Sequence, residues 1–235
     1  MVDIEVYSHQ EDYMKFQNLR PDYIKAITVS LDLAKKYVAD KEEVILADFC
    51  CGTGSNSKEF ASLLNGLRKV ILVDINGGFL EIAKKSGIKS KDLILQESDI
   101  LEASFLKECN IVLSIFAYHH VPDEKKQLYI NKIKECLKDK GILVLTEIYF
   151  NNKNNCMEYY KKLFESIPSD KTIPGLKKFL QQTAESSDFE FKVSKDYADK
   201  QFEDNGFTLL HEEKIWSNDD NSDEKEGTFV QIYRL

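Results

Sequence analysis

The sequence predicts an α/β protein built on an open, largely parallel β-sheet, and three observations lead to that prediction. Short apolar runs of strand length alternate with longer segments whose apolar residues recur at helical spacing. One short run, residues 44–49, passes into a small-residue glycine turn and then into a helical pattern at Lys58. A second run, residues 69–74, ends in the carboxylate of Asp74, twenty positions after Gly54. Alternation of this kind implies parallel strands joined by right-handed crossovers, with helices on both faces of the sheet.

The individual elements follow from the same periodicity. Strands are expected near residues 44–49, 69–74, 92–96, 110–116 and 141–148, and helices near 21–39, 56–65, 78–86 and 123–138. Gly66, Gly87 and Gly141 lie at or just beyond the ends of expected helices, where a glycine C-cap is common. Two later apolar runs, 206–216 and 228–235, flank a polar stretch and predict an antiparallel hairpin.

The segment between the fifth strand and this hairpin has a different character. Two amphipathic stripes run through it, one around Tyr160 and Leu163 and one around Leu176 and Leu180, with prolines between them. They are either ordinary helices packed on the core or a lid over the mouth of the sheet, where α/β proteins bind ligands. We expect a single domain over residues 1–235, with an N-terminal helical segment at 1–40 and a helical lid or substrate cap inserted at 151–205.

Composition narrows the possible partners and compartments. The net charge is −8, and acidic residues are interleaved with the lysines, which disfavours nucleic acid as a partner without excluding it. The five cysteines include no Cys-x-x-Cys pair, so neither disulfides nor a metal site is expected. No apolar run reaches the length of a membrane span, and residues 1–7 lack the pattern of a signal peptide. We therefore expect a cytoplasmic protein without a membrane partner.

The glycine turn after the first strand is the expected ligand site. Gly52 and Gly54 suit positions that need positive φ or that a ligand approaches closely. The turn leads into a helix, whose first N–H groups favour an anionic or polar cofactor group. Asp74 lies where a Rossmann-like unit places the acid that binds ribose hydroxyls. A nicotinamide cofactor is disfavoured, because its fingerprint requires a glycine at position 57, where this chain has Ser57.

These motifs resemble those of class I S-adenosylmethionine-dependent methyltransferases of the small-molecule type. The resemblance covers residues 40–150 and, in outline, 200–235. It rests on five motifs in the family's order and spacing: the turn Asp48-Phe-Cys50-Cys-Gly52-Thr-Gly54, Asp74 after strand two, Glu97-Ser-Asp99-Ile100 after strand three, residues 111–122 and residues 137–145. It implies a Rossmann-like seven-stranded sheet with an antiparallel C-terminal hairpin. The chain departs from the family at Cys50, where glycine is usual, and cysteine adopts positive φ less readily than glycine.

The resemblance also implies a set of residues that bind S-adenosyl-L-methionine. Asp74 would accept both ribose hydroxyls, and Asp99 would accept the adenine amino group, with Ile75 and Ile100 on either side of the ring. The methionine part would lie against Asp48, Cys50, Gly52, Gly54 and Ser114, with Asp48 facing the amino group. Arg20 would hold the carboxylate, the alternative being a surface arginine. Tyr13 and Phe16 are expected over the sulfonium.

Two histidines are the candidates for catalysis. His119 and His120 follow the fourth strand, where the transferred methyl group would point. Histidine is suited to act as a base near neutral pH, although a pair at a strand end also serves structural roles. The sequence thus favours methyl transfer to an O or N atom of a small-molecule acceptor by in-line displacement. Two alternatives remain: an RNA- or protein-modifying methyltransferase on the same fold, and a non-catalytic cofactor-binding partner subunit. The sequence leaves the oligomeric state undecided, with a homodimer as one possibility.

Overall fold

A seven-stranded sheet forms the centre of the protein, as the sequence predicts. The computed structural model describes residues 15, 17–38, 43–64, 66–169, 175–185, 192–216 and 224–235. The strands are β1 Ile45–Phe49, β2 Leu67–Asp74, β3 Ser90–Glu97, β4 Cys109–Ile115, β5 Leu137–Tyr149, β6 Thr208–Trp216 and β7 Gly227–Arg234, in the spatial order β3-β2-β1-β4-β5-β7-β6. Strands β1 to β5 are parallel, whereas β7 runs antiparallel to both of its neighbours. The expected C-terminal hairpin is therefore confirmed.

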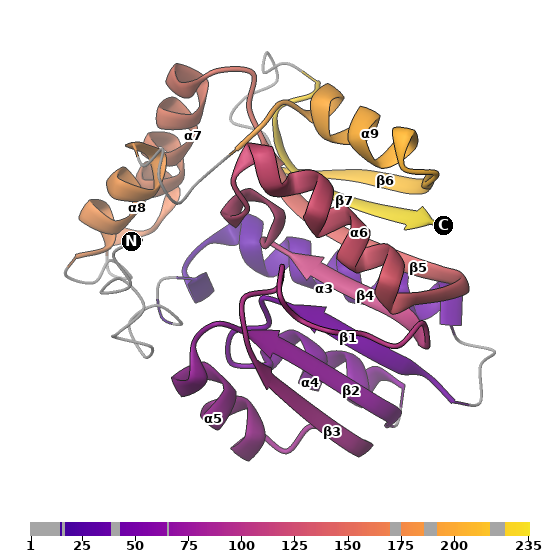
Figure 1. Ribbon diagram of the computed structural model, residues 1–235. Helices are drawn as coiled ribbons and strands as arrows, with labels where there is room; N and C mark the ends of the chain where they lie inside the picture. The colour runs from indigo at the N-terminus through magenta and orange to yellow at the C-terminus, as the bar shows by residue number, and fades with distance from the viewer. Residues whose placement is uncertain are drawn as a thin grey trace.

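Helices cover both faces of this sheet (Figure 1). The helices α3 Pro21–Val38, α4 Ser55–Leu63 and α5 Gly77–Lys85 pack on one face, and α6 Lys126–Cys136 and α9 Lys195–Asp204 pack on the other. Two separate apolar cores result, because successive strand residues point to opposite faces. Leu46 belongs to the first core, for example, and Ala47 belongs to the second.

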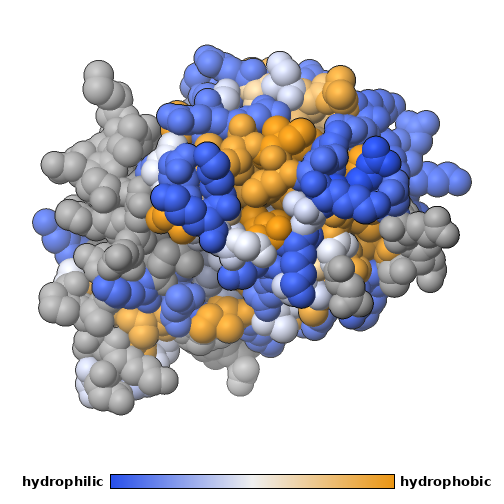
Figure 2. Space-filling model, turned by 90° about the horizontal axis from the view of Figure 1, so that it is seen from below, coloured by the Kyte–Doolittle hydropathy of each residue, from blue (hydrophilic) through white to orange (hydrophobic). Residues whose placement is uncertain are grey.

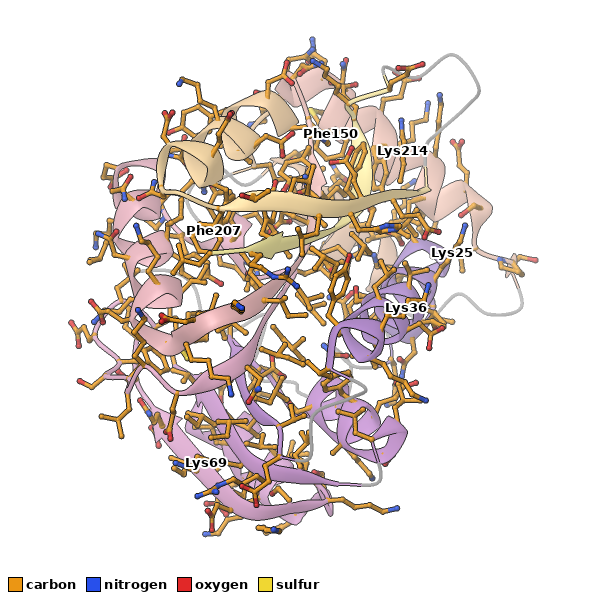
Figure 3. All side chains as sticks on the ribbon, turned by 90° about the vertical axis from the view of Figure 1, so that its right-hand side faces the viewer. Lys25, Lys36, Lys69, Phe150, Phe207 and Lys214 are labelled. Atoms are coloured by element: carbon orange, nitrogen blue, oxygen red, sulfur yellow. The ribbon has the colours of Figure 1, made fainter. Side chains whose placement is uncertain are left out.

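The antiparallel end of the sheet is held to α3 by both packing and a hydrogen bond. Figure 3 views this side and shows Lys25 on α3 near one end of β6, with Phe207 near the other end. The Lys25 ammonium donates to the carbonyl of Ile215 at 3.5 Å. In the part of the chain that the structure describes, no helix has both the length and the apolar character needed to cross a membrane.

The opposite edge of the sheet, strand β3, is exposed. A loop at residues 98–108 follows it in place of a helix, and Phe105 of this loop stacks on Phe49 at a ring distance of 4.9 Å. Figure 2 looks onto this end of the molecule and shows hydrophobic surface bordered by hydrophilic residues. Lys91 and Asp92 on β3 are both exposed, and charges of this kind protect an edge strand from pairing with another chain.

The described residues of the inserted segment form three helices. The helices α7 Lys153–Ser166 and α8 Leu176–Glu185 pack on each other and on Ile148 and Phe150 at the end of β5, forming a third, smaller core. Figure 1 shows both on the side of the molecule at which the parallel strands β1, β2 and β4 end. Helix α9, by contrast, packs on the second core of the sheet. The placement of α7 and α8 is compatible with the lid interpretation, which remains a prediction.

One expected helix cap takes a different form. Gly141 was expected to cap the helix near 123–138, but α6 ends at Cys136 and Gly141 lies inside β5. A Cβ atom at position 141 would lie 2.9 Å from the carbonyl oxygen of Lys138 and 3.0 Å from that of Cys109. Glycine is therefore needed here for close backbone packing rather than for a cap.

Candidate active site

The glycine turn after β1 has three residues in the left-handed region, at alternate positions. The φ angles are 55° at Cys50, 53° at Gly52 and 69° at Gly54. The turn is tied to the next strand because the N–H of Cys51 donates to the carbonyl of Val73 at 3.0 Å. Cys50 therefore takes the conformation expected of the family's glycine, at a cost of about 1–2 kcal/mol for a residue with a Cβ. Burial, together with the nearby charges of Asp74 and Asp48, raises the pKa of the Cys50 thiol, which stays protonated.

The two glycines of the turn serve different purposes. Apart from its two neighbours in the chain, no atom of the described residues would lie within 4 Å of a Cβ at Gly52, so open space lies beside this residue. A Cβ at Gly54 would lie 3.0 Å from the Cβ of Ala83 and 3.1 Å from a methyl group of Leu72. Gly54 is therefore required by the packing of the turn on α5 and β2. Gly52 leaves room for a ligand at the carboxyl end of β1.

Asp74 lies beside that space with its carboxylate oriented by two backbone hydrogen bonds. Gly52 donates to Oδ2 at 2.7 Å, and Asn76 donates to Oδ1 at 2.9 Å. Burial raises the pKa of Asp74, whereas these two hydrogen bonds lower it. An ionised carboxylate oxygen has two lone pairs, so each oxygen retains the capacity to accept one more donor. Asp74 therefore retains the capacity to accept from two hydroxyl groups.

Asp48 adds a second buried carboxyl group to the same region. The Ser57 hydroxyl donates to its Oδ2 at 2.7 Å. Burial raises the pKa of Asp48 to about 7, and the charge of Asp74 contributes to the rise. A carboxyl group in this state is stabilised in its ionised form by any cation that binds next to it.

The residues expected around an adenine ring differ in exposure. Ile75 follows β2 and is 66% exposed, whereas Ile100 is buried in the second core. Asp99 accepts the N–H of Leu101 on Oδ1 at 2.9 Å, which fixes the turn after β3. The three residues lie after neighbouring strands, and their contact with a ring remains a prediction.

Ser114 lies on the α6 side of β4. Its hydroxyl group is 2.7 Å from the hydroxyl group of Tyr129 on α6, and both are fully buried. The Ser114 side chain thus contacts α6 through Tyr129, and its contact with a cofactor remains a prediction.

Arg20 lies at the start of α3 in a buried ion pair. Its guanidinium donates to both carboxylate oxygens of Asp22, at 3.3 and 2.8 Å, and to Gln17 at 3.1 Å. The rings of Phe116 and Tyr160 lie 5.5 and 6.0 Å from its central carbon. A ligand carboxylate would therefore share this guanidinium with Asp22. Tyr13 and Phe16, expected nearby, lie outside the described residues.

His119 is paired with a buried carboxylate that sequence reasoning missed. Glu147, near the end of β5, lies with its Oε1 2.5 Å from Nδ1 of His119, and the N–H of His119 donates to its Oε2 at 3.0 Å. Burial raises the pKa of Glu147, whereas the N–H groups of Ile148 and His119 and the charges of His120 and Lys192 lower it. A glutamate inside the largely apolar run 142–150 was the signal that would have identified it.

The turn that carries the histidines is rigidly supported. Lys126 of α6 is fully buried and donates to the carbonyls of Tyr118 and Val121 at 3.2 and 2.6 Å. Its ammonium also lies 4.5 Å from the centre of the Tyr118 ring. The ring of His120 lies 4.1 Å from that of His119 and is only partly buried. Of the two histidines, His119 therefore has the geometry of an oriented base, because Glu147 fixes its ring.

A cavity opens next to these residues, between the end of β5 and the first turns of α7 and α9. Its volume is about 470 Å³, and polar and charged side chains contribute much of its lining, including those of Asp123, Lys153, Lys192 and Tyr197. The described residues include no group of His, Cys, Asp and Glu arranged to hold a metal ion. The site is thus a glycine turn with two carboxylates, an oriented histidine and a polar cavity.

Comparison with known proteins identifies a similar domain and a similar fold. Residues 46–141 match the family model of a methyltransferase domain. An uncharacterized methyltransferase of Oceanobacillus iheyensis is 28% identical over 122 residues, which cover 52% of this chain and 54% of that protein. The chain thus spans about half the length of this relative.

Solved structures show the same fold at low sequence identity. A putative methyltransferase from Bacillus halodurans superposes with a TM-score of 0.61 at 14% identity, covering 87% of this chain and 97% of that one. The Burkholderia thailandensis 1,6-didemethyltoxoflavin-N1-methyltransferase, with 1,6-didemethyltoxoflavin and S-adenosylhomocysteine bound, gives a TM-score of 0.58 at 11% identity, covering 89% of this chain and 77% of that one.

The strand order and the glycine turn define a Rossmann-like fold of the methyltransferase type. Over residues 46–141, and in its fold, the chain is similar to class I S-adenosylmethionine-dependent methyltransferases.

Proposed function

We propose that the protein transfers a methyl group from S-adenosyl-L-methionine to an O or N atom of a small-molecule acceptor. The observation that carries this proposal is the open space at Gly52, bordered by the Asp74 carboxylate. A left-handed glycine with room beside it and a carboxylate with accepting capacity form a site for the ribose and methionine parts of this cofactor.

The charge of the site also fits the cofactor. Asp48 and Asp74 are buried and acidic, and the cofactor carries a sulfonium and an ammonium group that such carboxylates would stabilise. Asp74 would accept the ribose hydroxyls, Asp48 would face the ammonium group, and Ile75 would cover the adenine. When bound, the cofactor supplies a methyl group that its own positive charge activates for displacement.

The chain's own residues would then align the acceptor and take up its proton. Glu147, acting as a carboxylate, would accept the Nδ1 proton of His119, which leaves Nε2 as the basic atom of the ring. His119 would accept the proton of an acceptor hydroxyl or ammonium at Nε2. A positioned base of this kind contributes typically 10²–10⁴-fold to the rate.

A small acceptor is supported by the size of the neighbouring cavity. Its volume of about 470 Å³ falls in the range of small-molecule sites. The structurally similar Burkholderia enzyme is by name an N1-methyltransferase, and its structure holds 1,6-didemethyltoxoflavin. The net charge of −8 further favours such an acceptor over RNA.

The direct test is transfer of a labelled methyl group. The protein is incubated with S-adenosylmethionine labelled in its methyl group and with a cell extract, which is then separated into small-molecule, RNA and protein fractions. We expect label in the small-molecule fraction, and less of it with His119→Ala. Label confined to RNA or protein would contradict the proposed acceptor class, and no label in any fraction would favour a non-catalytic subunit.

A further inference from the structure

We propose that the acceptor carries an anionic group, a carboxylate or phosphate, which binds in the cavity between Lys153 and Lys192. This inference rests on the proposed function and names the substrate class of that site. Among the described residues, the cavity lining contains two lysines and one acidic side chain, that of Asp123. Asp123 is itself within 3.4 Å of the ammonium of the buried Lys126. The described part of the lining therefore presents a positive charge to a ligand.

The backbone of the cavity adds to this positive potential. Asn152 and Ser194, which both line the cavity, are the N-caps of α7 and α9. The two helices, of 14 and 10 residues, thus begin at the same space. Helix N-termini carry partial positive charge and favour anions. The lysine pair and the two helix ends favour the same sign of ligand charge.

Tyr197 provides a further donor with a defined orientation. The Tyr118 hydroxyl donates to Oε1 of Gln201, which fixes the amide group of that residue. Nε2 of Gln201 then donates to the Tyr197 hydroxyl oxygen at 3.0 Å. A tyrosine hydroxyl that accepts one hydrogen bond retains its own proton for donation. Tyr197 lines the cavity and is thus suited to donate to a ligand oxygen.

The cavity is coupled to the reaction centre through shared side chains. The Tyr160 ring lies 5.4 Å from the ammonium of Lys192 and 6.0 Å from the central carbon of Arg20. The charge of Lys192 also lowers the pKa of Glu147, the partner of His119. An anionic group held at Lys192 would therefore lie near His119. The acceptor O or N atom of the same small molecule would then reach the methyl group of S-adenosyl-L-methionine.

The test compares an acid with its neutral counterpart. Binding of 4-hydroxybenzoate, 4-hydroxybenzamide and inorganic phosphate is measured by calorimetry, with S-adenosylhomocysteine both absent and saturating. We expect the acid to bind at least tenfold more tightly than the amide. Lys192→Gln and Lys153→Gln should each weaken the acid at least tenfold, and Lys192→Arg should retain most of the affinity. Lys161→Gln, an exposed lysine of α7 outside the cavity lining, is the matched control and should change nothing.

Affinity for S-adenosylhomocysteine, measured in the same variants, separates this inference from the proposed function. If the wild type did not bind S-adenosylhomocysteine, the proposed function would be refuted. The binding of inorganic phosphate would still show whether the cavity holds an anion. Equal binding of acid and amide, no measurable binding of either anion, or unchanged affinity in the lysine variants would overturn the anionic-acceptor inference.

Discussion

The buried carboxyl group of Asp48 allows the electrostatics of the site to be tested in the absence of any ligand. Burial raises its pKa from 3.8 to about 7. A group whose pKa is higher in the folded state binds protons more tightly there, so its contribution to stability is complete below pH 3.8 and is lost as the pH rises through 7. Replacing Asp48 with asparagine removes this titration and leaves an amide oxygen that can still accept from Ser57.

The size of the effect follows from the two pKa values. Between pH 5 and pH 6 the unfolded carboxyl is ionised and the folded one is protonated, so the free energy of unfolding falls by about 1.4 kcal/mol per pH unit. The fall becomes less steep toward pH 7, where the folded carboxyl is half ionised. The wild type should therefore lose about 2.3 kcal/mol relative to Asp48→Asn between pH 5 and pH 7. Above pH 8 the difference between the two proteins should be constant.

Urea denaturation at half-unit steps from pH 5 to pH 8 measures this difference directly. Asp139→Asn is the matched control, because the Asp139 side chain is 91% exposed. The control should follow the wild type at every pH. If the free energies of unfolding of wild type and Asp48→Asn changed equally with pH across this range, Asp48 would already be ionised in the folded protein. Its assignment as a carboxyl group with a raised pKa, which a bound cation would ionise, would then be wrong.

Three other predictions concern the turn and the base. Cys50→Gly should raise the free energy of unfolding by about 1 kcal/mol in thermal or urea denaturation, because it relieves a left-handed residue, whereas Cys50→Ala should not. Gly52→Ala should fold with a modest loss of stability yet bind S-adenosylhomocysteine at least tenfold more weakly. Gly54→Ala should mainly lower the free energy of unfolding, by about 2 kcal/mol. If the two variants behaved alike, the distinction between open space at Gly52 and close packing at Gly54 would be refuted. Glu147→Gln should lower kcat about 10²-fold with KM for the cofactor unchanged. Its acidic pH–rate limb should also move to lower pH, since a neutral amide no longer stabilises protonated His119, and an unmoved limb would assign Glu147 a purely structural role.

The sequence predicted the sheet well because its signals are local. Strands buried on both faces appear as short apolar runs, and the glycine turn and Asp74 mark the carboxyl ends of β1 and β2. The C-terminal hairpin was equally visible, since two apolar runs flank a polar stretch. Helix α9 was not separated from the lid, because its packing on the second core depends on contacts distant in the sequence.

The site was predicted less completely, because partners across strands leave no local pattern. The histidines were found from their place after β4, but Glu147 lies 28 positions away from His119 and meets it only through the pairing of β4 and β5. Arg20 was expected to bind a ligand, and nothing in its local sequence indicated how tightly Asp22 would pair with it. The cavity between α7 and α9 likewise arises only when both helices meet the end of β5.

Calorimetric titration with S-adenosylhomocysteine, with NAD as the competing nucleotide, tests the central claim most directly. Wild type and Asp74→Asn are compared, and Asp92→Asn on the exposed edge strand serves as control. We predict one micromolar site in the wild type, at least tenfold weaker binding in Asp74→Asn, unchanged binding in Asp92→Asn and no binding of NAD. A tenfold loss corresponds to about 1.4 kcal/mol, less than one charge-assisted hydrogen bond contributes. Unchanged affinity in Asp74→Asn, or no binding to the wild type, would contradict the assignment of the glycine turn and Asp74 as the cofactor site.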